Sequence, residues 1–252
     1  PLGPPLPLPG TPQRLLLSDD GVRAWLSFPD RDEGGFVESL RAWDLRTGAP
    51  LPGEARLRGP LLQLSLPSPG HLLAVGPADG ATQLLSTANL ATLAEWPHDP
   101  FEPIVSADAA PGEQTLWLLA RATDAHLGQD VLLRWHPGED AQLSRQVLAN
   151  RPFAVAALPE GRAFVAGETA HALVQSDGTL DPIARGRDAS DGSLGALARH
   201  GGKRLLAVSS RHGVHLFNED GRPLGRTLRL AAPPLDGIFD IAFDDAGEHL
   251  FV

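Results

Sequence analysis

The nine histidines are the side chains of this chain best suited to chemistry, because imidazole both binds metal ions and titrates near neutral pH. The closest pair in the sequence is His212 and His215. On a strand, an odd separation of three directs the two side chains to opposite faces, so they would make a poor chelate. The other histidines are scattered singly along the chain, and we therefore expect no metal site.

Two acidic segments superficially resemble calcium-binding loops: DRDEGG (30–35) and DDAGEH (244–249). Neither has the alternating Asp or Asn ligands, closed by a distant Glu, that an EF-hand requires. We interpret both segments as turns in which acidic side chains accept hydrogen bonds from their own backbone.

The common catalytic motifs are missing from the sequence. There is no G-x-S-x-G to present a serine nucleophile, and the single lysine, Lys203, lies in GGKRL without the glycine spacing of a phosphate-binding loop. The absence of cysteine excludes thiol catalysis, disulfides and Cys-ligated metals. We therefore expect no catalytic residues and no cofactor.

The composition restricts the class of partner and the source. A formal charge of −10 disfavours nucleic acid and anionic membranes, whose recognition needs clustered Lys and Arg. No stretch approaches the roughly 18–20 uninterrupted apolar residues of a membrane helix. A single Lys among many Arg, with no Tyr or Met, is typical of a GC-rich bacterial genome. We expect a cytoplasmic protein, with the periplasm as the alternative.

The elements that must position any site recur at a regular interval. A turn glycine followed by a short apolar run occurs six times, about 41–49 residues apart. The turn glycines are Gly21, Gly70, Gly112, Gly161, Gly202 and Gly247. A period in this range is typical of β-propeller blades. Short apolar runs bounded by Gly, Asp, Asn and Pro indicate strands rather than helices.

The sequence therefore predicts an all-β chain, a β-propeller of four-stranded antiparallel blades. Residues 1–12 contain six prolines and predict an extended linker, and the propeller occupies residues 13–252. The predicted blades span residues 13–57, 59–98, 100–151, 152–188 and 192–230, with an incomplete sixth at 233–252. A complete ring would have six or seven blades, within the range of known propellers.

One large apolar position recurs just before the turn between the third and fourth strand of each unit. It is occupied by Trp43, Leu85, Trp135, Val174 and Phe217. A large side chain there can fill the space between neighbouring blades, which stabilises the fold by about 1.5–3 kcal/mol for each side chain buried. We interpret this position as structural.

Two segments resemble WD40 repeats. LRAWDLRTGAPLPG (40–53) resembles the end of such a repeat, with Trp43-Asp44 as the signature dipeptide and Thr47-Gly48 in the following turn. DIAFDDAGEHLFV (240–252) resembles its opening strands. Looser matches to the dipeptide are Trp135-His136, Val174-Gln175 and Phe217-Asn218. The resemblance covers residues 13–252 and implies a bacterial WD40-like propeller with divergent repeats. Quinoprotein-like and lactonase-like propellers, whose blades end in similar turns, are the alternatives.

In the predicted fold, the loops between second and third strands and those between blades lie on one face. Their acidic residues are Asp30, Asp32, Glu33, Asp79, Asp99, Glu102, Asp124, Asp130, Glu168, Asp188, Asp191 and Asp236. Their basic residues are Arg31, Arg58, Arg121, Arg187 and Arg211. This face is expected to be negative and to steer a basic protein or peptide. The alternative is that solvated acidic loops merely follow the net charge. The predicted partner-binding residues are Asp99, Glu102, Asp124, Asp188, Asp191 and Asp236.

Two functions remain open from the sequence. The first is a non-catalytic interaction or regulatory platform, and the resemblance implies attachment to a signalling or enzymatic domain. The chain begins without Met and ends inside an apolar run, so we expect part of a longer multidomain protein. The second is a propeller enzyme, a metal-dependent lactonase or a quinoprotein-type dehydrogenase. It would need Asp, Glu, His or Asn from several blades around a cation, and the sequence shows no such set.

Overall fold

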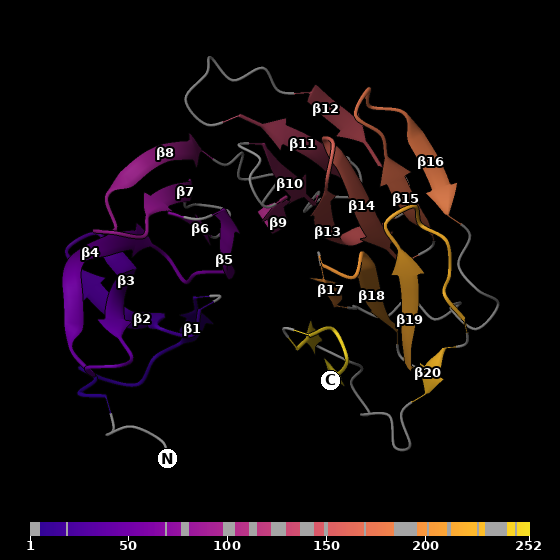
Figure 1. Ribbon diagram of the computed structural model, residues 1–252. Helices are drawn as coiled ribbons and strands as arrows, with labels where there is room; N and C mark the ends of the chain where they lie inside the picture. Colours follow the sequence, from indigo (N-terminus) through magenta and orange to yellow (C-terminus); the bar gives the residue numbers. More distant parts are fainter. Residues whose placement is uncertain are drawn as a thin grey trace. The chain divides into compact units, whose positions relative to one another are not determined.

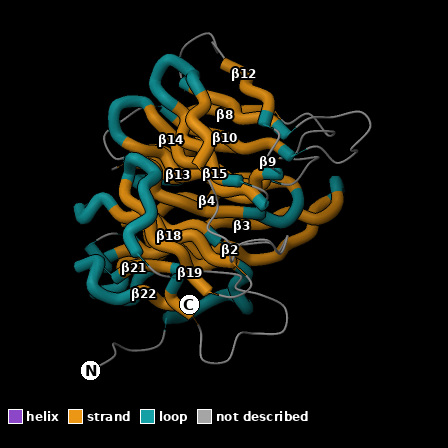
Figure 2. Tube along the Cα trace, turned by 90° about the vertical axis from the view of Figure 1, so that its right-hand side faces the viewer, coloured by secondary structure: helices purple, strands orange, loops and turns teal. Residues whose placement is uncertain are grey.

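In the computed structural model of this chain, all the regular elements of the described residues are β-strands (Figures 1 and 2). The described residues are 6–18, 20–68, 70–76, 81–97, 104–110, 115–121, 130–136, 144–148, 151–168, 170–183, 196–200, 202–210, 213–225, 227–229, 241–244 and 246–252. A search of these residues finds no helix with the length and apolar character needed to cross a membrane. They divide into two compact units, the first ending at Ile104 and the second beginning at Val105.

The first unit contains two four-stranded antiparallel sheets. The first sheet has the order β1 (Arg14–Leu17), β2 (Arg23–Asp32), β3 (Gly35–Asp44) and β4 (Pro50–Arg58). The second has the order β5 (Gln63–Ser68), β6 (His71–Val75), β7 (Ala81–Ser86) and β8 (Thr92–Pro97). In both sheets each strand pairs with the next strand in the sequence, which is the meander expected of a blade.

The second unit contains three more sheets of the same kind and one hairpin. The third sheet comprises β9 (Ile104–Ala109), β10 (Leu116–Ala120), β11 (Val131–Trp135) and β12 (Ser144–Val147). The fourth comprises β13 (Pro152–Leu158), β14 (Arg162–Gly167), β15 (His171–Val174) and β16 (Leu180–Ile183). The fifth comprises β17 (Leu197–His200), β18 (Leu205–Ser210), β19 (Gly213–Asn218) and β20 (Leu228–Arg229). The hairpin pairs β21 (Ala242–Phe243) with β22 (Leu250–Phe251). The predicted all-β fold of four-stranded antiparallel blades is confirmed, and the number of blades in a closed ring stays a prediction.

The turn after β3 shows why the signature dipeptide suits a strand end. Asp44 Oδ1 accepts hydrogen bonds from the backbone N–H groups of Arg46 (2.8 Å) and Thr47 (3.0 Å). Gly48, with φ at +70°, donates its N–H to the Asp44 carbonyl oxygen. A left-handed residue costs least as glycine, so the sequence and the turn geometry agree. Asp44 therefore has a structural role, and the same is true of Asn218, which accepts two backbone N–H groups in the fifth sheet.

The recurring apolar position before these turns is buried in all five sheets. Trp43, Leu85, Trp135, Val174 and Phe217 are each no more than 4% exposed. Leu85, Val174 and Phe217 lie in cores shared by two sheets. Trp43 packs instead with Ala24, Leu26 and Phe28 of its own sheet and with Leu6. The proline-rich start thus contributes one side chain to a core, although the sequence predicts only a linker there.

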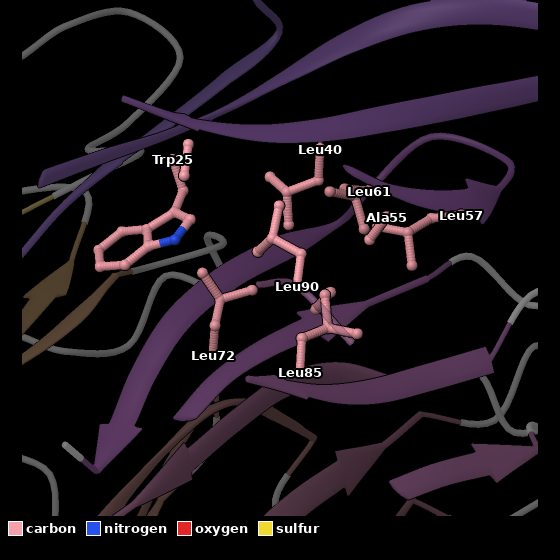
Figure 3. Close-up of a cluster of buried hydrophobic side chains, with 10 residues drawn as sticks. Trp25, Leu40, Ala55, Leu57, Leu61, Leu72, Leu85 and Leu90 are labelled. Atoms are coloured by element: carbon pink, nitrogen blue, oxygen red, sulfur yellow. The ribbon is translucent and has the colours of Figure 1, made fainter. Parts of the chain in front are cut away.

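The core of the first unit lies between its two sheets (Figure 3). Trp25, Leu40, Ala55 and Leu57 come from the first sheet, and Leu72 and Leu85 come from the second. Leu61 and Leu90 join them from the adjoining segments. The two sheets therefore bury their facing surfaces against each other, which is how propeller blades are stabilised.

A buried carboxylate connects these two sheets as well. Glu38 of β3 is 1% exposed, and its carboxylate accepts hydrogen bonds from the Ser27 hydroxyl and from the Leu61 backbone N–H. Leu61 also accepts a bond at its carbonyl oxygen from Arg14 Nε, at 3.3 Å. Since Leu61 begins the approach to the second sheet, side chains of the first sheet satisfy backbone groups that would otherwise be buried without partners.

Candidate functional site

The six residues predicted to bind a partner, Asp99, Glu102, Asp124, Asp188, Asp191 and Asp236, lie outside the described residues. The structure does describe five acidic residues of the wider predicted face: Asp30, Asp32, Glu33, Asp130 and Glu168. The five carboxylates have different charged neighbours, so the net charge around each of them differs.

Glu168, which follows β14, is compensated by arginines. Its carboxylate lies 2.9 Å from Arg121 Nη2 and 3.7 Å from Arg151 Nη1, and its side chain is only 12% exposed. Its backbone N–H also donates to the Arg151 carbonyl oxygen. Two guanidinium groups on one largely buried carboxylate leave little negative field at this position, so Glu168 contributes structure rather than attraction for a basic partner.

Unlike Glu168, the acidic side chains at the tip of the β2–β3 hairpin are exposed. These two strands are ten residues each and pair along their whole length, from Arg23 opposite Asp44 to Asp32 opposite Gly35. The tip residues are exposed, and Glu33 has no ion-pair partner within the described part of the chain. Asp32 accepts the Gly34 N–H at 2.7 Å, which shapes the tight turn.

A groove of about 810 Å³ lies beside this tip. Its lining residues are Asp32, Glu33, Gly34, Phe36, Val37, Arg58, Gly59 and Pro60. Phe36 is 44% exposed, and its aromatic side chain lines the same groove as the two acidic residues. Sequence reasoning placed Asp32, Glu33 and Arg58 on the acidic face but missed Phe36. Its position directly after the acidic turn, as an apolar residue, is the sequence signal that could have identified Phe36.

A second set of polar side chains lies on the first strands of the third and fifth sheets, in the second unit. Ser106 and Asp108 share one face of β9, because their positions differ by two. Ser106 Oγ accepts the Val155 N–H at 3.2 Å, and Asp108 Oδ2 accepts the Ala157 N–H at 2.9 Å. Arg199 Nε of β17 lies 3.7 Å from Asp108 Oδ2. Ser106 and Asp108 thus accept hydrogen bonds from backbone N–H groups of β13, the edge strand of the fourth sheet. We therefore interpret their role as structural.

Burial raises the pKa of Asp108 above its ordinary 3.8, and the Arg199 guanidinium and two backbone N–H groups only partly oppose this. By contrast, the backbone N–H groups of Thr47 and Arg46 lower the pKa of Asp44. The folded state therefore holds the Asp108 proton more tightly than the unfolded state, so this group lowers stability as pH rises from 3.8 through its folded pKa. We expect carboxyl NMR titration to give an Asp108 midpoint above 3.8 and an Asp44 midpoint below it. An Asp108 midpoint at or below that of Asp44 would contradict the assignment.

The histidines form no metal cluster where the structure describes them. No group of three or more His, Asp or Glu side chains there could hold an ion. His212 lies outside the described residues, whereas His215 Nδ1 lies 3.2 Å from Thr227 Oγ1. His171 is 3% exposed and stacks edge-on against Phe217, in the core of the second unit. In the acidic segment at 244–249, Asp245 lies outside the described residues, and Asp244 accepts the N–H groups of Glu248 and His249.

Comparison with known proteins supports the fold. The chain is similar to the crystal structure of Kluyvelomyces marxianus Hsv2, a yeast WD40 β-propeller, with a TM-score of 0.61. The two sequences are 10% identical, and the match covers 96% of this chain and 72% of that chain. The fold is that of a β-propeller. At this identity the likeness concerns the fold alone. No protein-family model and no curated protein matches the sequence.

Proposed function

We propose that this chain is a non-catalytic, WD40-like platform for protein interaction within a larger bacterial regulatory protein. The observation that carries the proposal is the groove beside the β2–β3 tip, which exposed Phe36 lines together with Asp32 and Glu33. An exposed aromatic ring with charges at its edge is the composition of an interface anchor. β-Propellers commonly present such surfaces to proteins and peptides.

The chemistry of the groove selects the class of partner. Asp32 and Glu33 attract Lys or Arg, and the Phe36 ring suits an apolar side chain or the alkyl part of a basic one. Arg58 also lines the groove and would disfavour a uniformly basic segment. The matching ligand is a peptide with one or two basic residues next to an apolar residue.

The predicted acidic face extends this proposal to further loops. We propose that Asp99, Glu102, Asp124, Asp188, Asp191 and Asp236 add long-range attraction for the same basic partner. Their effect would fall at high salt, because charges in exposed loops are screened within about 10 Å at 0.1 M ionic strength. Contacts with Phe36 would depend much less on salt.

The test is a selection of displayed random peptides on the immobilised chain, followed by affinity measurement with the strongest peptide. We expect the selected peptides to share a basic residue beside an apolar one. Phe36→Ala is expected to weaken the binding about tenfold or more, as for an aromatic anchor. Glu33→Lys is expected to weaken it several-fold, with a reduced salt dependence.

Glu160→Lys is the matched control, because Glu160 is also an exposed turn carboxylate with no ion-pair partner in the described structure, and it lies in the second unit. It changes the net charge by the same amount as Glu33→Lys and is expected to leave the affinity nearly unchanged. The proposal fails if the selected peptides are acidic, or if they bind Phe36→Ala as tightly as the unaltered chain.

A further inference from the structure

A smaller cavity of about 250 Å³ lies between the third and fourth sheets, within the second unit. Its wall on the third sheet is formed by Trp117, Leu132, Arg134 and Gln146. Its other wall is the turn between β15 and β16, at Ser176, Asp177 and Gly178. Ligand pockets for drug-sized molecules usually have volumes of about 300–1,000 Å³, so this cavity suits a small chemical group.

The register of the third sheet brings two of these side chains together. Trp117 of β10 lies directly opposite Arg134 of β11. Residues opposite each other in an antiparallel pair project from the same face, and the Arg134 guanidinium carbon lies 5.6 Å from the centroid of the Trp117 ring. The cation is thus held over the aromatic ring at the edge of the core.

Side chains of the third sheet donate hydrogen bonds to the turn between β15 and β16 of the fourth sheet. Arg134 Nη1 donates to the Ser176 carbonyl oxygen at 3.3 Å, and Gln146 Nε2 donates to the Gly178 carbonyl oxygen at 2.7 Å. Gly161, with φ at +68°, lies so close that a Cβ there would be 2.9 Å from Arg134 Nη2. The guanidinium is therefore positioned by three separate segments of the chain.

Two of the residues that line this cavity each have an unused hydrogen-bond donor. Trp117 Nε1 and Arg134 Nε are buried and have no hydrogen-bond partner among the residues that the structure describes. Trp117 is only 3% exposed. A buried donor without an acceptor costs about 1–3 kcal/mol, so such groups in a folded protein need an explanation.

The charge of Arg134 is also uncompensated. No carboxylate in the described part of the chain forms an ion pair with it. Among the described lining residues Asp177 is the one acid, and its Oδ1 accepts the Thr179 N–H at 2.8 Å. A half-buried guanidinium with no carboxylate partner in the described structure favours an anionic ligand, since opposite charges attract.

We propose that this cavity binds a carboxylate, whose oxygens accept hydrogen bonds from Trp117 Nε1–H and Arg134 Nε–H. A carboxylate provides both the missing acceptors and the missing negative charge. It can come from a small free carboxylic acid or from the C-terminus of a peptide. The site is in the other unit from the β2–β3 groove, so it is independent of the function proposed above.

The experiment is an NMR titration that observes the indole N–H signals of the tryptophans. The chain has five Trp, and Trp117→Phe identifies the signal of Trp117. Adding acetate is expected to shift this signal downfield in a saturable way. Trp25 and Trp43 also have buried indole N–H groups with no partner among the described residues, and neither is among the described lining residues of this cavity. Their signals are therefore internal controls and should stay in place.

Acetamide is the matched neutral probe, and it should bind at least tenfold more weakly than acetate. Arg134→Lys keeps the positive charge but removes the Nε–H donor, and it is expected to weaken acetate binding about tenfold. Arg162→Lys changes an arginine outside the cavity and should have little effect. N-acetyl-dialanine distinguishes the source: tighter binding than acetate identifies a peptide terminus, and weaker binding identifies a small free acid.

Three outcomes would overturn the proposal: no shift of the Trp117 signal, equal shifts of all the indole signals, or equal binding of acetamide. Should Arg134→Lys fail to fold, Trp117→Phe tests the other donor, because it keeps an aromatic ring under Arg134. In that variant the backbone amide signals of Asp177 and Gly178 report binding, and acetate affinity should fall several-fold. Unchanged affinity in Trp117→Phe would equally refute the assignment.

Discussion

Gly53→Ala is expected to destabilise the first unit by about 3–5 kcal/mol. Gly53 lies on β4 with φ at +102°, and a Cβ built there would be 2.1 Å from the backbone oxygen of Asn89 and 2.6 Å from its carbonyl carbon. Asn89 belongs to the turn between β7 and β8, in the neighbouring sheet. Because backbone rather than a flexible side chain meets the new atom, the two sheets would have to separate. Denaturant unfolding followed by tryptophan fluorescence measures the loss, since Trp25 and Trp43 report on this unit.

Gly21→Ala is the matched control for that substitution. Gly21 has φ at +64°, but a Cβ at this position would meet no atom within 4 Å. It therefore tests the backbone strain alone, which costs about 1–2 kcal/mol. If both variants lost the same stability, the close approach of Gly53 to Asn89 would be refuted as the cause.

Glu38→Ala is expected to cost the first unit about 2–5 kcal/mol. The carboxylate is the acceptor for both the buried Ser27 hydroxyl and the Leu61 N–H, so its removal leaves two donors without acceptors and a cavity between the sheets. The same unfolding measurement applies. Glu38→Gln should cost less than half as much, because the amide oxygen can accept the Leu61 N–H while the amide group donates to Ser27 Oγ.

Glu54→Ala provides the comparison for an exposed carboxylate. Glu54 Oε2 lies 3.0 Å from Arg41 Nη2, and both side chains are about a third exposed. Surface ion pairs contribute only about 0–1 kcal/mol, so this variant should unfold almost as the unaltered chain does. A loss in Glu38→Ala no larger than that in Glu54→Ala would contradict the buried role of Glu38.

The strands and their turns were predictable from the sequence, because the signals for them are local. The turn after β3 needs an acceptor at Asp44 and a left-handed residue at Gly48, and both residues are visible in the chain itself. The apolar position represented by Trp43 was recognised in the same way, from its repetition before each turn. The partners of Trp43 differed from expectation, since it packs within its own sheet and against Leu6 of the proline-rich start.

The roles of the polar side chains could not be predicted in this way. The sequence does not distinguish Asp108 and Glu38 from ordinary surface acids. In the structure, Asp108 accepts a backbone N–H from the neighbouring fourth sheet, and Glu38 accepts one from Leu61 in the segment that connects the first two sheets. In the same way, only the register of β10 and β11 shows that Trp117 lies opposite Arg134. The sequence by itself determined the strand period and the turn chemistry, which depend on neighbours a few residues apart. The tertiary structure alone decided which donors and charges remain uncompensated, because that depends on how separate sheets pack.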